Sequence, residues 1–429
     1  MFSNFIKIAF RSLYRQLGYT FINVAGLAIG LACSILIFLY VVNELTYDRF
    51  NENAERIYRI GVKGQMSGNE LNQAVTAAPM AEAMMNDYPE VESVTRIAKF
   101  GGWLVIQGEK KFNETEKTFL FADSTFFDVF SFKLIRGNPK TALTKPRSLI
   151  LTQKAARKYF GEEDPMGKSL KVEEDTVFYE VTGIIEDIPV NSHFHFELLG
   201  SLSSIGRSRS TLWVNHQFYT YIMVAPGTDI EKFTERVNAI VEKYIGPQIE
   251  QFLGITMDQF FDAGNSFGYF LQPLLDIHLH SNLQVEIEPN GNPAYVYIFS
   301  VIAILILVIA CINFMNLATA RSAGRSREVG IRKVVGSSKS LQVGQFLTES
   351  VFLSFISLVF AILLVYFLLP YYNNIVRLKL EFNIFDNFYA IPILLLLAIF
   401  VGLLAGSYPA FVLASFKPVV VLKGKLQSG

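Results

Sequence analysis

The sequence has little cysteine and histidine, and its charges balance. Its 429 residues include two cysteines, Cys33 and Cys311, both inside apolar stretches, and five histidines. Two such cysteines build neither a disulfide framework nor a cysteine zinc cluster. The 38 basic and 38 acidic residues cancel, so total charge indicates no polyanionic partner such as nucleic acid. These absences exclude disulfide-stabilised domains, cysteine zinc modules and strongly basic nucleic-acid binders.

Charge is also absent from four long stretches, residues 17–43, 289–320, 350–376 and 387–416. Each stretch is long enough to cross a hydrocarbon layer about 30 Å thick as a helix. A wholly soluble globular protein is therefore excluded. The first stretch resembles a signal peptide, but its apolar residues continue well past Cys33, which favours an uncleaved anchor.

The basic residues are sorted along the chain, and this sorting predicts an orientation. Residues 1–20 carry three basic residues and no acid, residues 321–349 carry six against two acids, and residues 417–429 carry three. Residues 44–294 instead hold 24 basic and 34 acidic residues, a net charge of −10. Because Lys and Arg are retained on the cytoplasmic side, both termini are expected inside and residues 44–294 outside.

The predicted fold is therefore a membrane protein with four transmembrane helices and a large α+β extracytoplasmic domain inserted between helices 1 and 2. The segments are a cytoplasmic amphipathic N-terminal segment 1–20, helix 21–43, the extracytoplasmic domain 44–294, helix 295–320, a cytoplasmic loop 321–349, helix 350–370, a short extracytoplasmic loop 371–387, helix 388–416 and a cytoplasmic tail 417–429. The N-terminal segment is expected to contact membrane lipid.

Helical and strand patterns are mixed in the outside domain, which predicts an α+β organisation. One helix is expected to follow the N-cap Asp229 and to end at Gly246. A second helix is expected to follow Thr152 and to end before Gly161. Alternating apolar side chains at residues 177–181 predict a strand.

Small residues recur at four-residue spacing in two of the apolar stretches. Gly26 and Gly30 lie in the first, and Gly402 and Gly406 lie in the fourth. Such residues let helix backbones approach closely in lipid, although glycine is also simply common in membrane helices. The middle of each stretch contains no Asp, Glu, Lys, Arg or His, which proton relays, ion-coupled carriers and voltage sensors usually need. The membrane part is predicted to transmit motion rather than to conduct.

Motifs that would carry catalysis, a cofactor or a metal are weak. Residues 161–169 resemble a phosphate loop, but five residues separate the glycines instead of four, and three of them are acidic. The pairs His193 with His195 and His278 with His280 would each share a face if they lay on strands, but no third zinc ligand is evident. Ordinary polar roles are favoured, and we predict no catalytic, cofactor or metal site.

The loop 321–349 contains the most specific pattern. A short cationic helix ended by Gly336 would place Glu328 and Arg332 one turn apart, which favours the helix. Val329, Ile331, Val334 and Val335 would supply apolar contacts. A loop that merely touches lipid headgroups is the alternative, and charge does not decide between the two.

Four runs of sequence resemble MacB-like and FtsX-like ABC transporter permeases. The run NFMNLATARSAGRSREVGIRKVVGSSKSLQVGQFLTES resembles the family's cytoplasmic loop and third helix. The runs NVAGLAIGLACSILIFLYV, FGEEDPMGKSL and GSYPAFVLASFKPVVVLKGK agree with the same family. The resemblance covers essentially the whole chain, and it implies that residues 44–294 form a MacB-like periplasmic core domain.

The resemblance implies a non-enzymatic permease in a bacterial inner membrane. A dimer of cytoplasmic ABC ATPase subunits would hydrolyse ATP, and the loop's short helix, about residues 325–336, would dock on it. The positions that match the coupling motif are Arg325, Glu328, Gly330, Arg332, Lys333 and Gly336.

The resemblance also implies association with another permease chain and with a periplasmic adaptor. A homodimer is one form of that association, and the Gly26 and Gly30 stripe is a candidate interface for it. A second permease half is the other form, because many similar sequences continue past a KGKLQSG segment into four further spans.

Three functions stay open at this point. The first is export or extrusion of a substrate, whether antimicrobial, peptide or lipoprotein. The second is an FtsX-like regulator that activates an extracytoplasmic cell-wall hydrolase. The third is a receptor without an ATPase partner.

Overall fold

The computed structural model of the chain describes residues 17–115, 118–172, 177–320, 329–331, 333–384 and 389–415. The chain divides into two compact units. One unit, called here the membrane unit, consists of Met1–Asn43 and Ala294–Gly429. The other, called here the inserted domain, is Glu44–Pro293.

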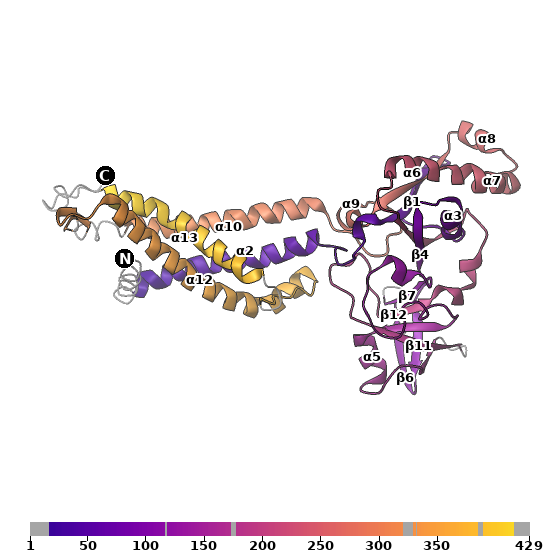
Figure 1. The fold of residues 1–429 in the computed structure, drawn as a ribbon, viewed down its shortest axis with the longest axis horizontal. Helices are drawn as coiled ribbons and strands as arrows, with labels where there is room; N and C mark the ends of the chain where they lie inside the picture. Colours follow the sequence, from indigo (N-terminus) through magenta and orange to yellow (C-terminus); the bar gives the residue numbers. More distant parts are fainter. Residues whose placement is uncertain are drawn as a thin grey trace. The chain divides into compact units, whose positions relative to one another are not determined.

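Among the described residues, four helices are long and apolar enough to cross a membrane (Figure 1). They are α2 (Leu17–Leu45), α10 (Pro293–Ala320), α12 (Lys339–Val376) and α13 (Ala390–Ser415). These apolar stretches form helices because a helix satisfies its backbone hydrogen bonds internally, as a lipid environment requires. α12 begins inside the predicted loop 321–349, where the Ser338 side chain accepts a hydrogen bond from the Leu341 N–H.

A mixed sheet forms the centre of the inserted domain. Its strands are β1 (Ile57–Met66), β2 (Asn69–Gln73), β3 (Thr76–Ala77), β4 (Val91–Lys99), β5 (Trp103–Gln107), β6 (Lys110–Glu114), β7 (Phe119–Ala122), β8 (Leu134–Arg136), β9 (Ser148–Thr152), β10 (Ser169–Val172), β11 (Val177–Ile185), β12 (Leu198–Ser201), β13 (His216–Val224) and β14 (Ser266–Pro273).

The strand order explains why this domain holds distant parts of the chain together. The order is β14-β1-β13-β4-β7-β12-β9-β11-β10-β5-β6, with β2 and β3 beside β1 and β13, and β8 beside β11. The pairs β9–β11 and β7–β12 are parallel, whereas β1 is antiparallel to both β13 and β14. The first strand of the domain therefore lies between its last two.

Short helices cover the sheet. They are α3 (Met80–Asp87), α4 (Phe126–Val129), α5 (Gln153–Phe160), α6 (Ile230–Val237), α7 (Gly246–Leu253), α8 (Met257–Asp262) and α9 (Ile277–His280), with the single turns η1 (Ala54–Arg56), η2 (Leu202–Ser204), η3 (Gly206–Arg209), η4 (Val241–Ile245) and η5 (Leu274–Asp276). The predicted fold class, four apolar helices with a mixed α/β domain after the first, is confirmed.

Two helix predictions have different outcomes. α5 begins after Thr152, whose side chain accepts a hydrogen bond from Ala155 N, and it ends at Gly161 with φ of 62°, as predicted. α6 begins after Asp229, but the prediction that it ends at Gly246 is wrong, because it ends at Val237. The next residue, Asn238, bonds through its side chain to both the N–H and the C=O of Tyr269 in β14. These bonds to the sheet compete with continuation of the helix.

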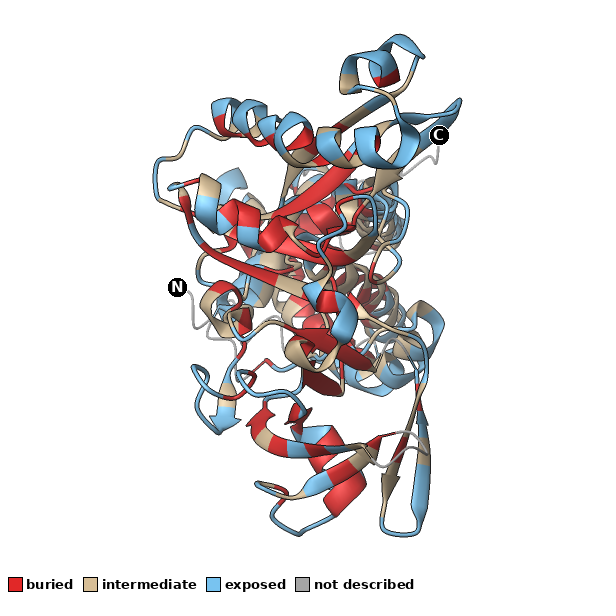
Figure 2. Cartoon of the chain, turned by 90° about the vertical axis from the view of Figure 1, so that its right-hand side faces the viewer, coloured by how far each residue is buried: buried red, intermediate tan, exposed pale blue. Residues whose placement is uncertain are grey.

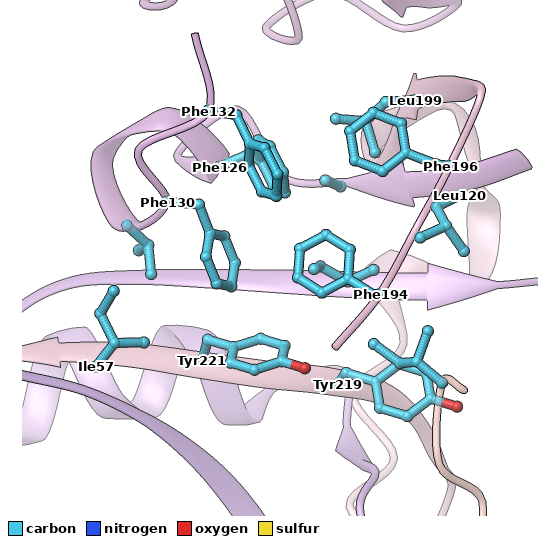
Figure 3. Close-up of a cluster of buried hydrophobic side chains, with 14 of the residues drawn as sticks. Ile57, Leu120, Phe126, Phe130, Phe132, Phe194, Phe196, Leu199, Tyr219 and Tyr221 are labelled. Atoms are coloured by element: carbon cyan, nitrogen blue, oxygen red, sulfur yellow. The ribbon is translucent and has the colours of Figure 1, made fainter. Parts of the chain in front are cut away.

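Buried residues gather on the strands and on the inward faces of the helices (Figure 2). Helices α3, α6, α7 and α8 pack on β1, β4, β13 and β14, and α5 packs on β7, β9, β11 and β12. A third core is rich in aromatic rings (Figure 3), and we call it the aromatic cluster: Phe126, Phe130, Phe132, Phe194, Phe196, Tyr219 and Tyr221. Several of its rings meet edge to face, as Phe130 and Tyr221 do at 5.1 Å between centroids, and others stack, as Phe126 and Phe132 do.

Candidate functional site

The loop that the sequence singles out is partly described by the structure. We call residues 321–336 the coupling segment. Arg325, Glu328 and Arg332 lie outside the described residues, whereas Gly330, Lys333 and Gly336 lie within them. The proposed contact between Glu328 and Arg332 therefore stays a prediction.

One face of the coupling segment packs against the ends of α12 and α13. Val329 is 4% exposed and belongs to a small apolar cluster with Phe346, Ala410 and Leu413. Lys333 Nζ donates a hydrogen bond to the Ala414 carbonyl oxygen at 2.8 Å. Because Ala414 lies in the last turn of α13, the ammonium group also meets the negative end of the helix dipole.

Three apolar side chains among the described residues of the coupling segment are exposed. Ile331, Val334 and Val335 are 50%, 66% and 82% exposed. Their spacing of three and four residues places them on one side of a helical turn, and we call them the outward apolar face. The turn then ends at Gly336, whose φ of 99° disfavours any other residue. An exposed apolar face is typical of a surface that binds another protein.

The glycine stripe of α2 faces α10 of the same chain. A Cβ atom built on Gly30 would lie 2.6 Å from Ala310 Cβ, and one on Gly26 would lie 3.3 Å from Asn313 Nδ2. One turn further, Ser34 Oγ donates a hydrogen bond to the Ala303 carbonyl oxygen at 3.1 Å. This face is occupied within the chain, so the suggestion that it serves dimerisation is corrected.

The glycines of α13 face α12. A Cβ atom on Gly402 would lie 2.6 Å from Val351 Cα, and one on Gly406 would lie 2.5 Å from Ser350 Cβ. Ser354 Oγ donates to the Ala398 carbonyl oxygen at 2.5 Å in the same contact. The two helix backbones approach so closely that each of these positions has room for glycine alone.

The His-x-His pairs do not lie on strands, the arrangement in which each pair would share a face. His193 and His195 lie in an irregular segment, and His278 and His280 lie in α9. Neighbouring histidines turn to different carboxylates, and no group of three potential metal ligands occurs among the described residues.

The histidines instead form pairs with distant acids. His193 Nδ1 is 2.8 Å from Asp48 Oδ1, His195 Nδ1 is 3.0 Å from Glu288 Oε2, and His278 Nε2 is 3.0 Å from Glu44 Oε2. The three acids carry no sequence signal, because each lies about 90 residues or more from its histidine. They are the functional candidates that sequence reasoning missed.

Two histidines have shifted pKa values with opposite signs. Burial alone would lower the pKa of His195, but the hydrogen bond and charge of Glu288 outweigh burial, and the pKa of His195 is raised. Burial lowers the pKa of His216 to about 4, and its Nε2 atom has no hydrogen-bond partner. Near neutral pH, His216 is therefore uncharged.

The fold defines a class, a membrane protein in which a large mixed α/β domain is inserted after the first of four apolar helices. Residues 20–240 match the sequence profile of the MacB-like periplasmic core domain, and residues 300–418 match that of the FtsX-like permease C-terminal domain. The chain belongs to the MacB-like and FtsX-like permease family. Four apolar helices in a permease of this family indicate an integral protein of the inner membrane.

Curated relatives match only in part. The macrolide export ATP-binding/permease protein MacB of Campylobacter jejuni is 29% identical over 116 residues, which cover 27% of this chain and 18% of that protein. The protein of the same name from Pasteurella multocida is 23% identical over 301 residues, covering 69% of this chain and 41% of that protein. The chain therefore matches less than half the length of these relatives.

Solved structures of similar domains were also found. A domain of a permease protein from Porphyromonas gingivalis is 24% identical with a TM-score of 0.45, covering 56% of this chain and 95% of that domain. The periplasmic region of MacB from Actinobacillus actinomycetemcomitans is 15% identical with a TM-score of 0.32, covering 51% of this chain and 90% of that region.

Proposed function

We propose that this chain is the permease subunit of an ATP-driven MacB/FtsX-type complex, and that it relays motion from a cytoplasmic ATPase dimer to the inserted domain for export or extrusion of a substrate. The observation that carries this proposal is the two-sided coupling segment. Its outward apolar face, Ile331, Val334 and Val335, is exposed, while Val329 on the other side is buried. ATP hydrolysis takes place in the partner, and this chain is not an enzyme.

The contacts of the coupling segment supply a route for the motion. An ATPase bound to the outward apolar face displaces the segment, and the displacement passes through Val329 to Phe346 in α12 and Leu413 in α13. The hydrogen bond from Lys333 to Ala414 adds a second connection to α13. Because α12 and α13 pack backbone to backbone at Gly402, they move together.

The topology that goes with this function follows the charge sorting. Both termini and residues 321–349 lie in the cytoplasm, and residues 44–294 lie outside the inner membrane, because the outside segment has a net charge of −10 and the other segments are basic. The predicted segment boundaries, including the short outer loop 371–387, are part of this proposal.

A second permease chain completes the complex. Most of α10 is exposed in the single chain, including Asn316. An amide facing hydrocarbon costs free energy unless it finds a hydrogen-bond partner. A homodimer or a second permease half therefore covers this side of α10, and lipid covers the rest.

The test is an exchange of the outward apolar face for charge. The double variant Val334→Asp with Val335→Asp is expected to reduce copurification of the partner ATPase at least about tenfold, because an interface core tolerates unpaired charge poorly. Val214→Asp is the matched control, since Val214 is 52% exposed and lies in the inserted domain. Equal copurification of the double variant and the control would refute the docking role.

Topology is tested by labelling of single cysteines from either side of the membrane. Cysteines at Val335 and at Val214 are expected to react from opposite sides, after replacement of Cys33 and Cys311. Reaction from the same side would refute the proposed arrangement.

A further inference from the structure

Two short segments connect the inserted domain to the membrane helices. The first crossing segment, residues 44–48, begins in the last turn of α2, and the second, residues 278–291, precedes α10. Both belong entirely to the inserted domain. Whatever motion reaches the domain through α2 and α10 passes through them.

The two crossing segments are bonded directly to each other. Glu44 and His278 are 5% and 6% exposed, and their side chains meet at 3.0 Å. The Tyr47 ring stacks on the His278 ring with 3.3 Å between centroids and an interplanar angle of 4°. Gly291 N donates to the His278 carbonyl oxygen at 2.8 Å. Removal of either partner would leave a buried polar group unsatisfied.

Gly291 packs directly against the contact between Glu44 and His278. A Cβ atom at position 291 would lie 2.7 Å from His278 Nε2 and 2.8 Å from Glu44 Oε2. Real Cβ atoms do not approach so closely, so any side chain here would force the Glu44 and His278 side chains apart. The requirement for glycine is therefore steric.

The first crossing segment is also anchored in the domain core. Asp48 Oδ1 is 2.8 Å from His193 Nδ1, and His193 Nε2 is 2.8 Å from the hydroxyl of Tyr221. Tyr221 belongs to the aromatic cluster shown in Figure 3. Asp48 has φ of 60°, a strained conformation that its buried hydrogen bonds stabilise.

The second crossing segment is anchored by a different set of side chains. The buried Arg59 guanidinium of β1 bonds Glu286 at 2.5 and 2.8 Å and Ser281 Oγ at 3.0 Å. Burial alone would lower the pKa of Arg59, but the hydrogen bond and charge of Glu286 raise it. Further along, Glu288 accepts a hydrogen bond from His195 N at 2.7 Å. Each crossing segment is thus fixed to the sheet and to the other segment.

We propose that a force-transmitting joint makes the two crossing segments move as one body with the inserted domain. The joint consists of Glu44, Tyr47, His278 and Gly291. The proposal rests on the proposed function, and it adds the residues through which force enters the domain. Without the joint, α2 and α10 would be free to move independently, and their motion would be lost before it reached the sheet.

The first test measures the joint without any partner. Spin labels at Leu45→Cys and Pro289→Cys, both exposed, are placed in a chain lacking Cys33 and Cys311 and reconstituted in nanodiscs. The distance distribution is expected to be single and narrow, and Gly291→Ala is expected to broaden it. Gly206→Ala is the matched control, because a Cβ atom at position 206 would meet nothing within 4 Å. Identical distributions for Gly291→Ala and the control would overturn the joint.

The second test asks whether the joint carries load. In the complex with its ATPase, Gly291→Ala is expected to retain ATPase copurification and ATP hydrolysis, while the ATP-dependent change in amide hydrogen exchange of the inserted domain falls at least about fivefold. If Gly291→Ala retained the full ATP-dependent change in amide hydrogen exchange, the force-transmitting role of the joint would be overturned. Loss of hydrolysis as well would also overturn it, since a joint that acts only on transmission leaves hydrolysis intact.

Exchange of Glu44 and His278 distinguishes loss of their contact from misfolding of the Gly291→Ala variant. Glu44→His alone is expected to behave like Gly291→Ala, and Glu44→His combined with His278→Glu is expected to restore the narrow distance distribution. Failure of the exchange to restore it would contradict a specific contact. If the wild-type chain binds no ATPase while the label distances behave as expected, the proposed function fails and the joint stands.

Discussion

The membrane unit and the inserted domain are stabilised by different interactions, although they alternate along one chain. In the membrane unit, Gly30 and Gly402 allow backbones to touch, and serine hydroxyls such as Ser354 Oγ bond the carbonyl oxygens of neighbouring helices. In the inserted domain, large aromatic rings fill the core and histidine–carboxylate pairs connect distant segments. The hydrophobic effect does not hold helices together in lipid, whereas it does bury apolar side chains of a domain surrounded by water. The membrane unit therefore depends on close packing and hydrogen bonds, and the inserted domain depends on an apolar core.

Under the proposed function, this contrast also separates the part that relays motion from the part that responds to it. The membrane unit has close backbone contacts between its helices, and such contacts are suited to relaying a displacement. The inserted domain has a densely packed aromatic core and buried ion pairs, which favour a response as one body. The three predictions below test the contrast, from the largest expected effect to the smallest.

The largest effect is expected in the aromatic cluster. Phe194 is fully buried and its ring lies 5.3 Å from Phe130 and 5.6 Å from Phe132. Phe194→Ala is expected to lower the free energy of unfolding of the inserted domain by about 3–5 kcal/mol, since it leaves a cavity. Urea unfolding followed by tryptophan fluorescence measures this selectively, because both tryptophans, Trp103 and Trp213, lie in this domain.

The control for this change is a surface aromatic. Phe252 is 54% exposed, so Phe252→Ala is expected to change the free energy of unfolding by less than about 0.5 kcal/mol. Similar losses for the two variants would show that the aromatic cluster does not dominate the domain's stability.

A pH effect confined to the inserted domain is expected next, since all five histidines lie there. His216 has a folded pKa of about 4, below its ordinary 6.5, so the unfolded chain binds a proton first as the pH falls. Stability is therefore lost between about pH 6.5 and pH 4, by at most about 3 kcal/mol. His216→Phe is expected to remove this part of the pH dependence in urea unfolding at stepped pH.

His195 provides the control of opposite sign. Its folded pKa is raised, so its pair with Glu288 stabilises the domain fully below about pH 6.5 and loses that contribution as the pH rises through the folded pKa. In the His195→Gln variant, the loss of stability that the wild-type domain shows as the pH rises through the folded pKa of His195 is expected to disappear. A His195→Gln profile that changes in the same direction as that of His216→Phe would contradict the two environments described here.

The smallest effect is expected at the helix contact in the membrane unit. Gly402→Ala places a methyl group 2.6 Å from Val351 Cα, and overpacking of this kind costs about 1–3 kcal/mol. Gly344→Ala in α12 is the control, because a Cβ atom there meets nothing within 4 Å and alanine favours the helix. The free energy of unfolding of the two variants is measured in bicelles, with the distance between labels on α12 and α13 as the signal. Equal behaviour would mean that the close backbone approach contributes nothing.

Particular residues show how far sequence reasoning reaches. Thr152 and Gly161 bound α5 as predicted, because capping and left-handed residues act locally. Gly246 does not end a helix, because Asn238 makes hydrogen bonds with a strand that lies about 30 residues later. The glycine spacing predicted close helix contacts, but which helix each stripe meets depended on packing between α2 and α10 and between α12 and α13.

The candidate site divides in the same way. Gly330, Lys333 and Gly336 could be named from the sequence because they lie in one continuous loop, and their coupling role stays a prediction. The split of that loop into a buried Val329 and an exposed Val335 required the ends of α12 and α13. Nothing in the sequence connects Glu44 to His278, which are 234 residues apart.

The sequence by itself determined the four apolar helices found among the described residues, the inserted position of the domain, the family and the presence of a basic loop between the second and third helices. These properties depend on uncharged length, charge sorting and local motifs, which act over a few tens of residues. Tertiary structure alone decided which helices touch, which side of the loop faces outward and which acids pair with the histidines. Those contacts depend on the three-dimensional approach of distant segments, and no local pattern encodes the partner of a buried side chain.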